Sequence, residues 1–115
     1  MSKPFTFSID AMGGDNAPRK IVEGIELAIK KHSSVNFILF GNQAEIKPLL
    51  AEFTHAARQS RIIHTEDFVT DDEKPGHALR SGRNSSMRLA INAVSDGEAD
   101  GVISAGNTGA LMAMA

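Results

Sequence analysis

The chain has 115 residues, of which 42% are hydrophobic and 23% charged, and its formal net charge is −2. These values predict one globular domain, and the scattered Lys and Arg residues argue against a nucleic-acid partner. The chain has no cysteine, which excludes disulfides and thiolate chemistry, and no apolar run near the about 18 residues of a membrane span, so we expect a soluble, cytoplasmic protein.

The first predicted unit is a strand followed by a helix. Residues 4–10, PFTFSID, are short and β-prone, and the glycines and polar residues of AMGGDNAP then end the strand. Residues 19–32 carry apolar side chains at helical spacing, and Pro18 suits the first turn of that helix because its missing N–H would have no partner there.

The second unit repeats this order. Residues 35–41, VNFILFG, are almost continuously apolar, as is typical of a strand buried on both faces. Asn42 with Glu45 resembles a capping box that opens a helix of about a dozen residues. Residues 61–65, RIIHT, predict a third strand.

The last third begins with the least regular segment, residues 66–84, in which we expect a short helix between residues 72 and 82. Residues 85–94 again show helical periodicity. Residues 101–106, GVISAG, predict a fourth strand, and a further helix begins at TGALMAMA.

Strands that alternate with helices indicate an α/β fold, with a mainly parallel sheet and helices on both faces. The last predicted helix is barely two turns long, and nothing that follows it in the sequence covers its apolar side chains. We therefore expect the chain to be a fragment, or one piece of a longer enzyme.

The stretch ISAGNTGAL is the first candidate site. Gly106 and Gly109 flank Asn107 and Thr108, and Ser104 precedes them, so backbone N–H groups at a helix N-terminus can converge on one oxyanion such as phosphate. The stretch has neither the lysine of a Walker loop nor the GxGxxG pattern of a dinucleotide site. The alternative is that Gly106 only ends a strand and Thr108 only caps a helix.

The stretch DAMGGDNAP is the second candidate. Asp10 and Asp15 bracket Gly13 and Gly14, and Asn16 follows. Carboxylates repel phosphate unless they hold a metal or orient a donor, so they can bind a cation or accept hydrogen bonds from substrate or backbone. The alternative is a tight turn that caps the next helix.

The irregular segment supplies further polar candidates. Lys74, Arg80 and Arg83 can neutralise a phosphate or an acidic partner, or form a solvated surface. Ser85 and Ser86 can face phosphate as a pair, although one of them capping the following helix is the simpler interpretation. The four histidines share no metal-ligand spacing, and we select none of them as catalytic.

Three strings in this order and spacing, IDAMGGDNAP, DEKPGHALR…NSSM and DGVISAGNTGALMA, resemble the N-terminal part of the PlsX phosphate acyltransferases, the phosphate:acyl-ACP acyltransferases of bacterial phospholipid synthesis. The resemblance covers essentially the whole chain, and it implies that residues 1–115 are the N-terminal portion of a single α/β catalytic domain. It implies a three-layer α/β sandwich similar to the isocitrate dehydrogenase and phosphate acetyltransferase fold.

The resemblance also implies transfer of a fatty acyl group from acyl carrier protein to inorganic phosphate, with no metal or other cofactor. It implies a homodimer that associates peripherally with the inner face of the cell membrane through a part absent from this chain. On this hypothesis the loop at residues 104–109 holds phosphate or the carbonyl oxygen, and the loop at residues 10–16 forms the facing wall. The catalytic residues stay unassigned.

Two alternatives remain open at this point. A phosphate acetyltransferase-like enzyme that uses acyl-CoA would share the fold and differ in its acyl donor. A non-catalytic regulatory or binding module would keep the α/β scaffold without the chemistry.

Overall fold

A computed structural model describes residues 4–14, 16–68, 74, 76 and 84–104 of the chain. Its elements follow in the order β1 (Phe5–Asp10), α1 (Arg19–Lys31), β2 (Val35–Gly41), α2 (Gln43–Leu50), α3 (Thr54–Gln59), β3 (Ser60–His64), α5 (Ser86–Ser95) and β4 (Gly101–Ile103). The alternation of strands and helices predicted from the sequence is confirmed. The helices expected between residues 72 and 82 and from residue 108 lie outside the described residues.

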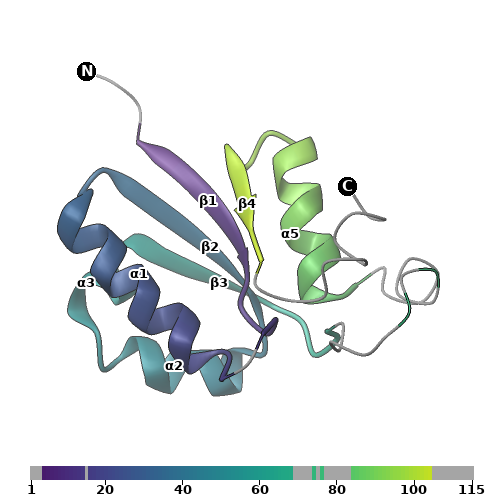
Figure 1. Cartoon of the computed structure of the whole chain (residues 1–115), viewed down its shortest axis with the longest axis horizontal. Coiled ribbons are helices and arrows are strands. Elements are labelled where there is room, and N and C mark those ends of the chain that lie inside the picture. The colour runs from purple at the N-terminus through teal and green to yellow at the C-terminus, as the bar shows by residue number, and fades with distance from the viewer. Residues whose placement is uncertain (1–3, 15, 69–73, 75, 77–83, 105–115) are drawn as a thin grey trace.

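The four strands described form one parallel sheet in the order β3-β2-β1-β4. Figure 1 shows α1, α2 and α3 together on one face of this sheet and α5 on the other. The three-layer α/β class is therefore confirmed. The carboxyl ends of all these strands lie along the same edge of the sheet, because parallel strands run in one direction.

The side chains of strand β2 pack against helices on both faces of the sheet. Its side chains alternate, so that Phe37 and Leu39 pack into a cluster with α1, α2 and α3, whereas Ile38 and Phe40 pack against α5. All four side chains are buried. The continuous apolar run of β2, rather than an alternating one, is therefore the consequence of helices on both sides.

Local signals set most helix boundaries. Helix α1 begins directly after Pro18, and the Asn42 side chain accepts a hydrogen bond from the Ala44 N–H at 2.9 Å at the start of α2. Helix α5 ends in a Schellman arrangement, in which Glu98 N–H reaches Ala93 O and Gly97, at φ +79°, donates to Val94 O.

The prediction of one helix of about a dozen residues after Asn42 is wrong. Helix α2 ends at Leu50, and a separate helix, α3, begins at Thr54 after Phe53, whose backbone is extended. The reason is tertiary, because the Glu26 carboxylate of α1 accepts the Ala56 N–H at 2.8 Å and so caps α3 from outside its own sequence. Strand β4 is also shorter than expected, since it ends at Ile103 within the described residues.

Candidate functional site

The carboxyl ends of β1 and β4 form the switch point of this sheet. Strand β1 pairs with β2 on one side and with β4 on the other. The chain leaves β1 for α1 on one face, whereas it reaches β4 from α5 on the opposite face. In open parallel sheets the crevice beyond such a point is where ligands bind, because the connections diverge there. Both glycine-containing stretches singled out in the sequence start here.

Asp10 is the polar centre of the switch point. It ends β1, and its side chain faces α5 with a relative exposure of 1%. The carboxylate accepts three hydrogen bonds: Oδ1 from the Ser86 hydroxyl at 2.5 Å and from Met12 N–H at 3.2 Å, and Oδ2 from the Ser104 hydroxyl at 3.2 Å. Asp10 therefore links the end of β1, the start of α5 and the end of β4.

The two adjacent serines at the start of α5 have different roles. The Ser85 side chain accepts the Arg88 N–H at 3.2 Å and caps the helix, which confirms the simpler of the two interpretations. Ser86 is fully buried, and its hydroxyl donates to Asp10 instead. Its own N–H donates to Asp67 O at 2.9 Å. Both serines are thus part of the framework at the switch point.

The loop after β1 is shaped by backbone conformation. Gly14 has φ +89° and Asn16 φ +63°, the left-handed region that glycine and asparagine tolerate best. Gly13 is buried and Asn16 is exposed. Asp15 lies outside the described residues.

This loop rests on the end of β2. A Cβ on Gly41 would lie 2.8 and 2.9 Å from the Met12 Cγ and Sδ, so the absence of a side chain at Gly41 lets Met12 pack closely. The Ala11 N–H also donates to Phe40 O at 3.1 Å. The first turns of the loop are therefore fixed on the sheet.

A second set of hydrogen bonds ties β3 to the same framework. Thr65, directly after β3, donates its N–H to Gly41 O at 3.0 Å and its hydroxyl to Asn84 O at 2.6 Å. Its hydroxyl oxygen accepts the Asp67 N–H at 3.3 Å. The connections that follow β3 and precede α5 are therefore held together just beyond the sheet.

The remaining predicted site residues are placed only in part. Lys74 is exposed. Gly106, Asn107, Thr108, Gly109, Arg80 and Arg83 lie outside the described residues, so their proposed contacts with phosphate stay predictions. Among the positions that the structure describes, no group of three or more His, Asp or Glu side chains could hold a metal ion.

Sequence reasoning missed His64, the last residue of β3. Its Nδ1 accepts the Gln43 N–H at 3.1 Å, at the first turn of α2, and the residue is exposed at the carboxyl edge. No sequence motif signals the hydrogen bond between His64 and Gln43, because it joins residues 21 positions apart.

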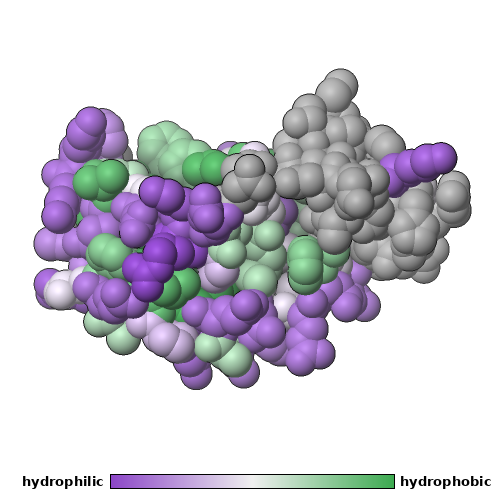
Figure 2. Space-filling model, turned by 60° about the horizontal axis from the view of Figure 1, so that its bottom comes forward, coloured by the Kyte–Doolittle hydropathy of each residue, from purple (hydrophilic) through white to green (hydrophobic). Residues whose placement is uncertain are grey.

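Figure 2, in which the bottom of Figure 1 comes forward, shows hydrophilic and apolar side chains interspersed over the described part of the chain.

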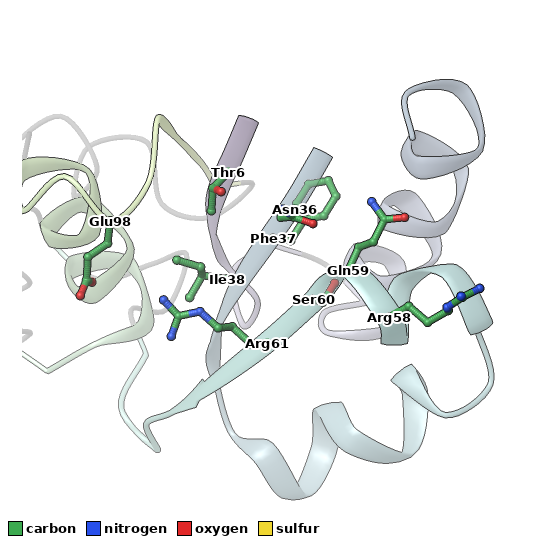
Figure 3. A pocket seen from close by; sticks show the side chains of 9 residues that line it. All are labelled: Thr6, Asn36, Phe37, Ile38, Arg58, Gln59, Ser60, Arg61 and Glu98. Carbon is green, nitrogen blue, oxygen red and sulfur yellow. The ribbon is translucent and has the colours of Figure 1, made fainter. Parts of the chain in front are cut away.

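The opposite, amino edge of the sheet also has a cavity, of about 340 Å³. Figure 3 shows its lining, with the guanidinium of Arg61 reaching past Ile38 toward the side of Glu98, and Arg58 pointing away. This cavity lies at the starts of β1, β2 and β3, away from the edge to which the loops carry the polar candidates. We therefore do not assign it as the candidate site.

Glu26 is a titratable group on α1, away from the switch point. Its Oε2 lies 2.7 Å from Nδ1 of His55, and its Oε1 accepts the Ala56 N–H. Burial raises the pKa of Glu26, but the hydrogen bonds from His55 and Ala56 and the positive charges of His55 and Lys30 outweigh it, so the pKa lies below its ordinary value of 4.5. Glu26 thus has a structural role.

Comparison with known proteins identifies close relatives. The family model described as "Fatty acid synthesis protein" matches residues 5–115. The chain is 53% identical to a phosphate acyltransferase of Azorhizobium caulinodans over 100% of this chain and 33% of that protein. It is 52% identical to a phosphate acyltransferase of Rhodospirillum rubrum over 100% of this chain and 33% of that protein.

A relative from a third organism gives the same result. A phosphate acyltransferase of Streptococcus sanguinis is 48% identical over 92% of this chain and 31% of that protein. The chain spans about a third of the length of the curated relatives it matches. Within the described residues, no helix is long and apolar enough to cross a membrane.

Proposed function

Because this chain belongs to the family of fatty acid synthesis proteins, as a PlsX-like N-terminal portion, we propose that the full-length protein is an acyltransferase that moves a fatty acyl group from acyl carrier protein to inorganic phosphate. The product is an acyl phosphate, for phospholipid synthesis. The names of the relatives support phosphate as acyl acceptor, and the resemblance noted in the sequence supports the carrier-bound donor.

The observation that carries the proposal is the Asp10 network at the switch point. Ser104 opens the predicted phosphate loop, and its hydroxyl is held by the buried Asp10 carboxylate. Since Asp10 already accepts three hydrogen bonds, it acts as a positioning residue that fixes the start of the loop rather than as a ligand of phosphate. A rigid start allows the following backbone N–H groups to be aimed before substrate binds.

The reaction needs positioning and electrostatic stabilisation more than a protein nucleophile. A phosphate oxygen attacks the thioester carbonyl carbon and forms the new C–O bond, and negative charge develops on the carbonyl oxygen. The C–S bond then breaks and the thiolate leaves, to be protonated by solvent. In this proposal the N–H groups of residues 106–109, with Asn107 and Thr108, hold the phosphate or the developing oxyanion.

The assembly and location follow from the same resemblance. We propose a homodimer in the cytoplasm that associates peripherally with the inner face of the membrane through parts of the family protein that this chain does not include. No cofactor is needed for the proposed step, because thiolate is a competent leaving group.

The test is phosphate-dependent release of free thiol from palmitoyl-acyl carrier protein by the full-length protein, with palmitoyl-CoA as the alternative donor. Release from the carrier only when phosphate is present supports the proposal. Release from the CoA thioester alone favours the acetyltransferase-like alternative, and no release from either contradicts enzymatic activity. In the same assay Asn107→Ala and Thr108→Val should each raise the phosphate KM by about tenfold, as expected for loss of one hydrogen bond to a charged group.

A further inference from the structure

His64 is held in one tautomer at the edge that carries the candidate site. A neutral imidazole has one donor and one acceptor nitrogen. Since Nδ1 accepts the Gln43 N–H at 3.1 Å, the proton of the neutral ring must be on Nε2. The residue is exposed, so the described residues present an N–H donor with a defined position at the end of β3.

Neighbouring contacts make this position rigid. His64 pairs with Gly41 in the register of β2 and β3. The next residue, Thr65, is buried and bonded to Gly41 O and Asn84 O, and α2 begins on the other side at Gln43. The imidazole is thus fixed by a strand and a helix on the α2 side of the sheet, whereas the Asp10 side chain contacts α5 on the opposite face.

The position of His64 determines which substrate it can reach. Adjacent strands are about 4.8 Å apart, so the end of β3 lies about 10 Å from that of β1 and about 14 Å from that of β4. A phosphate held beside Ser104 is therefore too far from His64 for a shared hydrogen bond. An acyl thioester whose carbonyl lies at the switch point has a long donor arm, and that arm can extend along the row of strand ends toward β3.

We propose that His64 binds the acyl donor, through a hydrogen bond from its Nε2–H to an amide or carbonyl oxygen of the donor's arm. This inference rests on the proposed function and adds a specificity residue to it. The charge-neutral N–H suits an uncharged oxygen. The α2 N-terminus does not compete for a ligand at this point, since the N–H groups of Gln43 and Ala44 are bonded to His64 and Asn42.

Two substitutions separate the two ring nitrogens. His64→Asn keeps an acceptor near the place of Nδ1 for the Gln43 N–H and removes the Nε2 donor. His64→Gln places an amide donor near the place of Nε2 and removes the Nδ1 acceptor. In the full-length protein His64→Asn should raise the KM for palmitoyl-acyl carrier protein by about 3- to 10-fold, the effect of one neutral hydrogen bond, with the phosphate KM unchanged. His64→Gln should keep the donor KM and lower the urea midpoint of unfolding.

These experiments test the role of His64 separately from the proposed function. The role of His64 is overturned if His64→Asn has wild-type kinetics. It is also overturned if the KM for the acyl donor rises in both variants in proportion to their loss of stability. If the wild-type protein shows no phosphate-dependent thiol release, the proposed function fails. Calorimetric binding of palmitoyl-acyl carrier protein without phosphate then tests His64 alone, and equal affinity of wild type and His64→Asn overturns the inference.

Discussion

Replacing Ser86 by alanine tests the hydrogen-bonded framework at the switch point most directly. The Ser86 hydroxyl is fully buried and donates to the Asp10 carboxylate at 2.5 Å. A hydrogen bond to a charged group contributes about 1.5–3 kcal/mol. Ser86 is the first residue of α5, where the interior helix propensity of alanine gives little compensation, so we expect Ser86→Ala to lower the free energy of unfolding by about 1.5–3 kcal/mol.

The assay is urea unfolding of the full-length protein, followed by circular dichroism, with Ser95→Ala as the matched control. Ser95 lies on the same helix but is exposed, so its replacement should change the free energy of unfolding by less than about 0.5 kcal/mol. The thiol-release assay should also show a lower kcat for Ser86→Ala, because one of the three donors that fix Asp10 is lost. Indistinguishable stabilities for the two variants would refute the framework role of this hydrogen bond.

Two further predictions concern stability away from the switch point. Because the pKa of Glu26 lies below its ordinary 4.5, the carboxylate stabilises the fold fully above about pH 4.5, and this stabilisation is lost as the pH falls through the folded pKa; Glu26→Gln should flatten that acid limb in urea unfolding measured from pH 3 to 7. Gly97 has φ +79° with open space around its Cβ position, so Gly97→Ala should cost about 1–2 kcal/mol from backbone strain alone, and Gly97→Asn less. Equal costs for the two residues at Gly97 would contradict a conformational origin.

Much of the fold could be predicted because its signals are local. The apolar run of β2 indicated two covered faces, and Asn42 marked a helix start with a capping side chain that the structure confirms. One of the pair Ser85 and Ser86 was expected to cap the next helix, and the structure shows that it is Ser85. The same reasoning failed between Leu50 and Thr54, where the helix boundary depends on a carboxylate from α1. Periodicity cannot report a cap that is supplied by another element.

The candidate site could be predicted as a place but not as a set of roles. The glycine-containing stretches follow two strands that are parallel neighbours in the sheet, so the sequence predicted that both begin at the same edge. That Asp10 is buried and bonded to Ser86 and Ser104 depends on pairing residues 76 and 94 positions apart, which one sequence does not reveal. The same limit applies to His64, whose partner Gln43 is brought near by the β2–β3 register.

The polar residues of this edge form one connected system rather than separate features. Thr65 and Asp67 after β3 are bonded to the start of α5, and α5 in turn holds Asp10, which holds Ser104. A buried carboxylate is costly unless its hydrogen bonds are made, so the folded state is stable only when these elements meet in this arrangement. The requirement to satisfy Asp10 therefore places the first residue of the predicted phosphate loop before any substrate arrives.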